Sequence, residues 1–384
     1  MLRWTRSLLL IVPLVALAAS WLTPRSVQTL PLFARKYKME CVQCHSAFPR
    51  LNKFGMEFRQ RGYRLEGADG TSPWEEDAFP LSLVGNVGVE YTSVNAADST
   101  GARSTLATSG FRQNAVEFHS AGTLAKKVTF HFDNGFATDT GLLETGMAFV
   151  QFDDFGKKGA LNLKAGIYDA EIPYLASSRR TTQAEYMMPV TLDGRGLELN
   201  GAQKGWWYAA GLINSDRTAG KPGDKTRNNL ENIYGWLMRE VGPHYVTARV
   251  FYDQQDPRTA GKRSSPHTQV DASAMLNAPH LVVVPAFTYQ KYADAVAADK
   301  SQSGLLEAMW LIDKDGWWAL TGRYEIAHLP KTTASAEEDH TLEAINLSYF
   351  VNRNARVALE WSHTGDNVLG PRVNDFQVYA HVGY

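Results

Sequence analysis

Two cysteines and a histidine within five residues carry the most specific chemistry in the sequence. They form Cys41-Val42-Gln43-Cys44-His45, the Cys-x-x-Cys-His spacing at which haem c is attached. The two thiols add across the vinyl groups of the porphyrin, and the imidazole beside the second thioether is placed to bind the iron. No other cysteine occurs in the chain, so one covalent haem uses both thiols. We therefore predict that Cys41 and Cys44 bind the cofactor and that His45 is the proximal iron ligand.

Two other chemistries use a Cys-x-x-Cys pair. A zinc site needs further ligands in a compact cluster, and no second Cys or His pair lies nearby in the sequence. A thioredoxin-like redox pair lies in a βαβ unit, and the surrounding sequence does not have that pattern. Both are therefore weaker interpretations than a covalent haem.

The distal ligand of the iron is left open by the sequence. Met39 and Met56 are the nearest thioether side chains, and a methionine ligand would raise the reduction potential. Met39 directly precedes the motif and is poorly placed to reach the opposite face of the haem. A histidine from the downstream part of the chain is an equal candidate, and packing in a core is the commoner role of a methionine. Met56 is kept here as a candidate distal ligand.

The motif lies in a segment, residues 20–79, that is too small to enclose a haem. A short helix is expected after Pro49, ending near Gly62. Its expected apolar face consists of Leu51, Phe54, Gly55 and Phe58. Gly55 leaves room on that face for the haem or for another wall. Because so short a segment rarely buries a core unaided, the rest of the chain or a partner must cover the haem.

The first residues, 1–19, have the pattern of a secretory signal peptide. Arg3 and Arg6 give the positive start, and Ala16-Leu17-Ala18 is a small-x-small cleavage site after an apolar run. A retained N-terminal anchor is the alternative. In both cases the cysteine pair leaves the cytoplasm.

Composition and hydropathy restrict the partners of the protein. The chain has 384 residues and a formal net charge of -1, so a nucleic-acid partner is not expected. No second apolar run of about 18 residues follows the signal peptide. If the protein is embedded in a membrane, we expect strands rather than helices to cross it.

From residue 80 to residue 384 the apolar pattern changes to period two, which is typical of half-buried strands. About sixteen such segments recur, an even number as in bacterial barrels. The connections between them alternate between long and short, as do the external loops and periplasmic turns of an outer-membrane barrel. We predict an all-β fold, a transmembrane antiparallel β-barrel of about 16 strands, with a short N-terminal helical haem c segment that enters and plugs the lumen from the periplasmic side.

Two further patterns favour a membrane barrel over a soluble β-sandwich or propeller. Gly205-Trp206-Trp207 and Gly316-Trp317-Trp318 each follow a short turn, where an interfacial aromatic girdle belongs. The polar face of the strands, which suits a water-filled lumen, carries Glu117, His119, His131, Asp133, Arg249, Arg356 and Glu360.

The long connection over residues 170–193 is the third long loop by count. In general porins the third loop folds inward and narrows the channel. This loop is therefore a candidate constriction, and an exposed surface loop is the alternative.

The chain resembles the fused monohaem cytochrome–porins of the bacterial outer membrane, best known from iron-oxidising bacteria. The resemblance rests on the blocks that flank the haem motif and on the barrel that follows directly. These blocks are Phe33-Ala34-Arg35-Lys36-Tyr37 and Pro49-Arg50-Leu51-Asn52-Lys53-Phe54-Gly55-Met56-Glu57-Phe58. By motif, the family would use Cys41 and Cys44 as thioether attachments and His45 as the proximal ligand.

The resemblance implies electron transfer across the outer membrane, with extracellular Fe(II) as donor and periplasmic c-type cytochromes as acceptors. Whether this amounts to an enzymatic Fe(II) oxidase activity, of the cytochrome c reductase type, stays open. Ferrous ion accepts carboxylate and imidazole ligands, so the lumen residues Glu117, His119, His131 and Asp133 are candidate transient contacts. Two alternatives use the same fold. One is a conduit for another redox donor or acceptor, and the other is a diffusion porin with a haem-containing plug.

Overall fold

The computed structural model describes most of the chain, in thirteen stretches. These are residues 32–65, 80–97, 102–137, 143–155, 159–190, 192–214, 232–254, 266–292, 300–313, 316–329, 338–352, 355–366 and 371–383. The predicted signal peptide, residues 1–19, lies outside the described residues. No helix in the described stretches is both long and apolar enough to cross a membrane.

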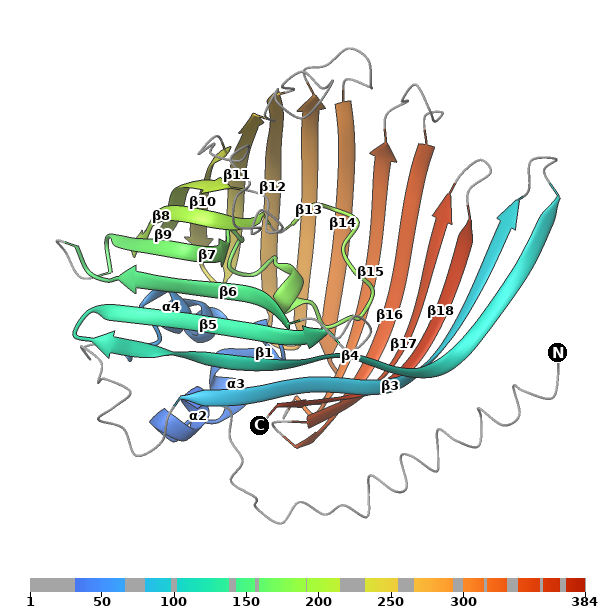
Figure 1. Ribbon diagram of the computed structural model, residues 1–384, viewed down its shortest axis with the longest axis horizontal. Helices are drawn as coiled ribbons and strands as arrows, with labels where there is room; N and C mark the ends of the chain where they lie inside the picture. Colours follow the sequence, from blue (N-terminus) through green and yellow to red (C-terminus); the bar gives the residue numbers. More distant parts are fainter. Residues whose placement is uncertain are drawn as a thin grey trace.

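The chain forms a closed barrel of sixteen antiparallel strands, so the predicted fold class is confirmed (Figure 1). Each strand pairs with the next in sequence, and the last strand pairs with the first to close the barrel. The strands are β3 (Leu81–Ala97), β4 (Arg103–Ala125), β5 (Val128–Ala137), β6 (Leu143–Phe152), β7 (Asn162–Asp169), β8 (Asp193–Gln203), β9 (Trp206–Asn214), β10 (Asn232–Val241), β11 (His244–Gln254), β12 (Pro266–Ala278), β13 (Leu281–Tyr292), β14 (Lys300–Leu311), β15 (Trp318–Leu329), β16 (Glu338–Asn352), β17 (Ala355–Asp366) and β18 (Arg372–Gly383).

The period-two pattern gives the barrel an apolar outer surface and an inner surface of buried side chains, many of them polar. On β14, Leu306 and Trp310 are exposed on the outside, whereas Glu307 and Met309 are buried inside. An outer surface of this kind is what a barrel in lipid presents. The aromatic girdle expected after the short turns is correct at three of its four tryptophans, because Trp206, Trp317 and Trp318 are exposed. Trp207 faces inward, because neighbouring residues of a strand point to opposite sides.

One expected long loop is a strand pair instead. The sequence placed a long connection over residues 93–112, but β3 and β4 remain paired as far as Ala97 and Arg103. The Thr, Ser and Asn residues in the described part of this stretch are paired between the two strands and continue the ladder. Their polarity indicated a loop, but cross-strand pairing overrode it.

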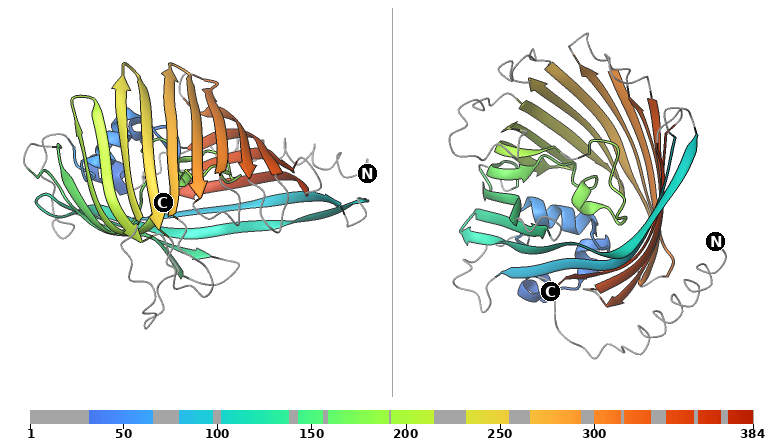
Figure 2. Two further views of the ribbon diagram at one scale, coloured as in Figure 1. Left: turned by 90° about the horizontal axis from the view of Figure 1, so that it is seen from above. Right: turned by 45° about the vertical axis from the view of Figure 1, so that its right-hand side comes forward.

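The N-terminal segment lies inside the barrel at the end where the short turns are (Figures 1 and 2). Its ion pairs with Asp154, beside the β6–β7 turn, and Glu240, beside the β10–β11 turn, show this position. It consists of α2 (Leu32–Tyr37), α3 (Cys41–Cys44), β1 (His45–Ala47), β2 (Arg50–Leu51) and α4 (Lys53–Gln60).

The helix expected after Pro49 is α4, and Gly62 follows it with a φ of +67°. The predicted buried face is wrong at one position. Phe54 is exposed, and Met56 is buried instead, with 1% of its surface exposed. The reason is that α4 packs between two walls rather than on one. Gly55 faces α3, and Met56 joins the apolar cluster on the barrel side.

The connection between β7 and β8, residues 170–192, folds into the lumen, so the inward alternative is confirmed. It contains a short 3-10 helix, η2 (Ser177–Arg179), and Ile172 and Tyr174 are fully buried. Lumen side chains bind its backbone. Arg249 donates to the carbonyl oxygens of Pro189 and Val190 at 2.9 and 2.6 Å. The wall charges expected to face water are therefore partly covered by this loop.

Candidate functional site

The two cysteines of the motif lie on a single helical turn. Residues Cys41–Cys44 form α3, and the Gln43 amide donates to the Glu40 carbonyl at 3.0 Å. The three-residue spacing puts both thiols on one side of the turn. No disulfide joins them, and burial raises the pKa of each thiol to about 11. The pair is therefore presented as two reduced, protonated thiols on one side of α3.

His45 follows in extended conformation, with its ring oriented by one hydrogen bond. Its Nδ1 lies 3.1 Å from the carbonyl oxygen of Pro49. Because a carbonyl only accepts, Nδ1 must carry the proton, and Nε2 keeps the lone pair that binds iron. Burial of the ring lowers the pKa of His45 to about 4, so the imidazole is neutral. This is the tautomer and charge state of a proximal ligand.

Asn52 fixes the motif to the helix that follows. Its amide group donates to the carbonyl oxygens of Val42 and Gln43 at 3.1 and 3.0 Å. Its oxygen accepts from the amide of Gly55 at 3.0 Å and so caps α4. A Cβ on Gly55 would lie 2.1 Å from the carbonyl oxygen of Cys44. The group that packs closely against Gly55 is thus the backbone of the motif itself.

His381 on β18 was not singled out by the sequence. The ring of Phe48 contacts both it and His45, with its centroid 5.2 Å from that of each imidazole. Both ring nitrogens of His381 are buried and have no hydrogen-bond partner. The strand alternation could have pointed to it, because Phe376 and Val382 face outward and odd-numbered residues of β18 face inward. Two thiols, a neutral imidazole and an unpartnered imidazole form a donor set that fits haem c.

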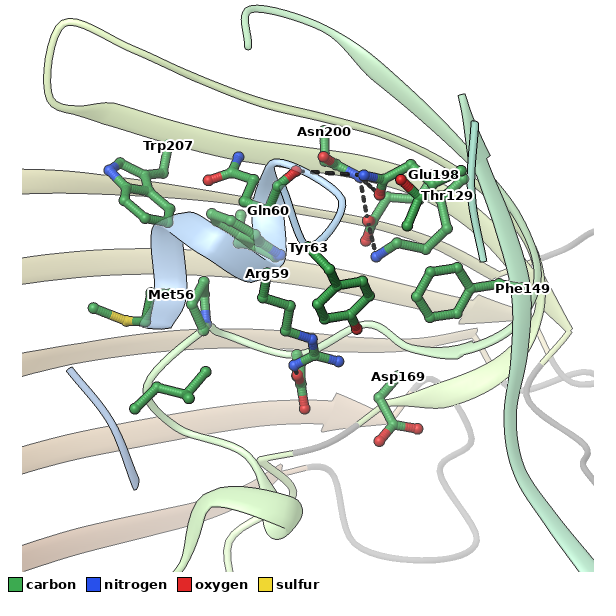
Figure 3. Close-up of a pocket in the computed structure, with 16 residues that line it drawn as sticks. Met56, Arg59, Gln60, Tyr63, Thr129, Phe149, Asp169, Glu198, Asn200 and Trp207 are labelled. Atoms are coloured by element: carbon green, nitrogen blue, oxygen red, sulfur yellow. Dashed lines mark hydrogen bonds and ion pairs between the residues drawn. The ribbon is translucent and has the colours of Figure 1, made fainter. Parts of the chain in front are cut away.

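Met56 lies on the other side of α4, toward the barrel wall (Figure 3). It lines a cavity of about 70 Å³ together with Trp207, Trp236, Arg59 and Tyr63. The cysteines and His45 do not line this cavity. The assignment of Met56 as a distal ligand stays a prediction, and a haem that reached it would have to extend around or displace α4.

Three of the four candidate Fe(II) contacts form one cluster on the lumen wall. The ligand atoms of His119, His131 and Asp133 all lie within 4.8 Å of one another. Nε2 of His131 is 3.2 Å from Asp133, and Nε2 of His119 is 3.0 Å from the fourth residue, Glu117. The Tyr63 hydroxyl, from the N-terminal segment, is 2.7 Å from Nδ1 of His131. Two imidazoles and a carboxylate at this spacing can bind a divalent transition metal.

Comparisons with known proteins agree with the barrel. No protein-family model matches the chain, and no curated protein matches it. The solved outer membrane channel DcaP of Acinetobacter baumannii superposes with a TM-score of 0.59 at 12% identity, over 83% of this chain and 100% of the channel. The anion-selective porin from Comamonas acidovorans gives 0.57 at 11% identity, over 79% of this chain and 99% of the porin.

OmpF of Salmonella typhi gives a TM-score of 0.56 at 11% identity, over 79% of this chain and 97% of that one. At such identities the likeness concerns the fold alone. The chain therefore has the porin-like sixteen-strand barrel fold. The haem prediction rests on its own residues, Cys41, Cys44 and His45.

Proposed function

We propose that this protein transfers electrons across the bacterial outer membrane through one covalent haem c held in the barrel lumen. The observation that carries the proposal is the position of the motif. Cys41 and Cys44 lie on one helical turn, His45 follows with its ring oriented by Pro49, and the barrel around them has an apolar outer surface, which supports a haem site. The donor would be extracellular Fe(II), and the acceptors would be periplasmic c-type cytochromes.

Each residue of the motif has one role in the proposed haem site. Bound haem would supply one-electron redox chemistry. Cys41 and Cys44 would hold it covalently and His45 would offer Nε2 to the iron, while Asn52 holds the motif against α4. A single haem cannot carry electrons across a hydrocarbon core of about 30 Å. Its position at one end of the lumen therefore decides which redox partner it can reach. Short turns lie on the periplasmic side of such barrels, which favours delivery of electrons to a periplasmic partner.

The Fe(II) contact that we propose is the cluster of His119, His131 and Asp133. It lies beside Tyr63 at the same end of the lumen as the haem motif, so an ion bound there is close to the cofactor. The variant Asp133→Asn should slow haem reduction by Fe(II) at least tenfold and leave reduction by dithionite unchanged. His328→Asn is the matched control, because His328 pairs with Asp339 at 2.7 Å in an exposed position. Equal rates in both variants would exclude the cluster as the donor contact.

The central test is a haem absorption spectrum of the purified protein in detergent, before and after addition of Fe(II). We expect the spectrum to change to that of reduced haem. A haem that dithionite reduces and Fe(II) does not would exclude iron as donor and favour a conduit for another redox partner. Absence of covalent haem in the exported protein would overturn the proposal as a whole.

The sidedness is tested by tag insertion. A tag in the connection between β9 and β10, residues 215–231, should be labelled on intact cells. The same tag at Gly242, in the short turn between β10 and β11, should be labelled only after the outer membrane is opened. The reverse pattern would place the haem segment at the cell surface.

The porin-like fold also favours a second candidate, a diffusion porin with a haem-containing plug. Conductance in a planar lipid bilayer separates the two functions. Solute conductance that is unchanged by haem loss or haem redox state would favour the porin. A current that changes with the haem redox state, together with haem that Fe(II) reduces, would favour electron transfer.

A further inference from the structure

His381 is an unusual residue among the lumen side chains. Both of its ring nitrogens are buried without a hydrogen-bond partner, and no other histidine of the described stretches has a buried ring nitrogen in that state. Native proteins rarely leave buried polar atoms unsatisfied, because the lost hydrogen bonds to water are not replaced. A group absent from the protein chain itself is therefore the natural partner of this imidazole.

The strand register directs His381 into the lumen near the short-turn end. It pairs with Arg356 on β17 and with Asn86 on β3, two residues before the end of β18. Its neighbour Val382 is exposed on the outer surface, so the alternation turns His381 inward. This is the end of the barrel that holds the N-terminal segment.

The positions of His381 and His45 suit two imidazoles that bind the same metal ion. Phe48 contacts both, with its ring tilted by 56° to His45 and by 54° to His381. Each imidazole centroid is 5.2 Å from the Phe48 centroid, so the two imidazoles are at most twice that distance apart. Two imidazoles on one metal ion need metal–nitrogen bonds of about 2 Å each. A flat macrocycle bound by both imidazoles would require the Phe48 side chain to rotate away from them.

The geometry points to His381 as the distal ligand of the haem iron, opposite His45. This inference rests on the haem site proposed above. In a ligand of this kind one ring nitrogen binds the iron, which accounts for one of its two unpartnered atoms.

Other candidates fit the position less well. Met56 packs on the barrel side of α4 and lines a cavity that the motif does not reach. His119 and His131 are held by Glu117 and Asp133. His381 is the lumen imidazole that contacts the motif segment and has both nitrogens available.

The test uses the full-length haem protein in detergent and reads the spin state of the iron. Two imidazole ligands should give a low-spin ferric spectrum in electron paramagnetic resonance and in absorption. His381→Ala should convert most of the haem to the high-spin form, and added imidazole should restore the low-spin spectrum. His381→Met should remain low-spin and raise the reduction potential, because a thioether ligand favours the reduced iron.

Matched controls separate this role from a structural one. Met56→Leu and His119→Asn should both keep the low-spin spectrum, and heat-modifiable migration on gels should show a folded barrel for every variant. A low-spin spectrum in His381→Ala that is identical to that of the wild type would overturn the inference. So would a high-spin wild type, or loss of the low-spin form in Met56→Leu instead.

Failure of the proposed function gives a different result. If the exported chain carries no covalent haem, haem staining of a denaturing gel is negative for the wild type. If the staining is positive and only the spin-state prediction fails, the haem site stands and His381 is not its ligand.

Discussion

Two segments occupy the lumen of this barrel, and they are held there by a different balance of contacts. The loop over residues 170–192 is held largely by its backbone, although Tyr174 and Thr181 also bind the wall through their side chains. Wall side chains such as Arg249, Arg323 and Glu360 bind its carbonyl and amide groups. The N-terminal segment, residues 32–65, is held largely by its own side chains. Arg50 pairs with Glu307 of the wall, and Arg59 pairs with Glu171 of the loop.

The loop is thus fixed to the barrel wall, whereas the N-terminal segment is docked against it. A loop whose backbone is bound at many points changes little when one of its own side chains is replaced. A segment docked through side chains depends on each of them, and it can leave one face open to a cofactor. The motif lies on such a face, with Val42 half-exposed and both cysteines partly buried.

The largest effect is expected at the thiols. Cys41→Ala together with Cys44→Ala should abolish covalent haem completely and leave a folded barrel, because the barrel strands do not include either residue. Haem staining of a denaturing gel measures the loss, and heat-modifiable migration measures the barrel. Val42→Ala is the neighbouring control and should keep its haem. Haem that persists after loss of both thiols would contradict the motif assignment.

The next largest effect, on the stability of the docked segment, is expected at the ion pair of Arg50 and Glu307. Their side chains are only 1% and 2% exposed. Glu307→Gln leaves the Arg50 charge buried without its partner, at a cost of about 3–5 kcal/mol. The measurement is the urea concentration at which protease cuts residues 32–65 while the barrel stays folded. Arg50→Met combined with Glu307→Met should restore most of the protection. If the single variant is as resistant as the wild type, side-chain docking does not hold this segment.

Asn52 offers an intermediate effect with two separable parts. Asn52→Ala removes the cap of α4 and should lower the stability of the docked segment by about 0.5–2 kcal/mol. Asn52→Asp keeps the oxygen that accepts from Gly55 but loses the amide that donates to Val42 and Gln43. We expect the Asp variant to keep α4 and to loosen the motif, seen as a broadened haem spectrum. Identical behaviour of the two variants would show that only one of the roles matters.

The smallest effect is expected at the rim. Lys53 pairs with Glu240, but 53% of the Lys53 side chain is exposed. Exposed ion pairs contribute about 0–1 kcal/mol, so Lys53→Met should hardly change the same protease–urea midpoint. A loss as large as that of Glu307→Gln would show that docking depends on the rim rather than on the buried pair.

Local patterns predicted much of the fold. Alternation gave the strands, their even number and the polar inner face, because the side chains of a strand point alternately to its two sides. The same reasoning failed where a local signal competed with pairing, as in the extension of β3 and β4 through residues that suggested a loop. It failed again at Phe54 and Met56, because a helix between two walls buries more than one stripe.

The sequence alone determined the haem prediction, since Cys41, Cys44 and His45 lie within five residues of one another and their spacing is a local property. Only the tertiary structure decided what faces them. Phe48 meets His381 because β18 closes the barrel against β3, which brings the last strand to the segment that precedes the first. Contacts of this kind depend on the register and stagger of all sixteen strands, and no short stretch of sequence records them.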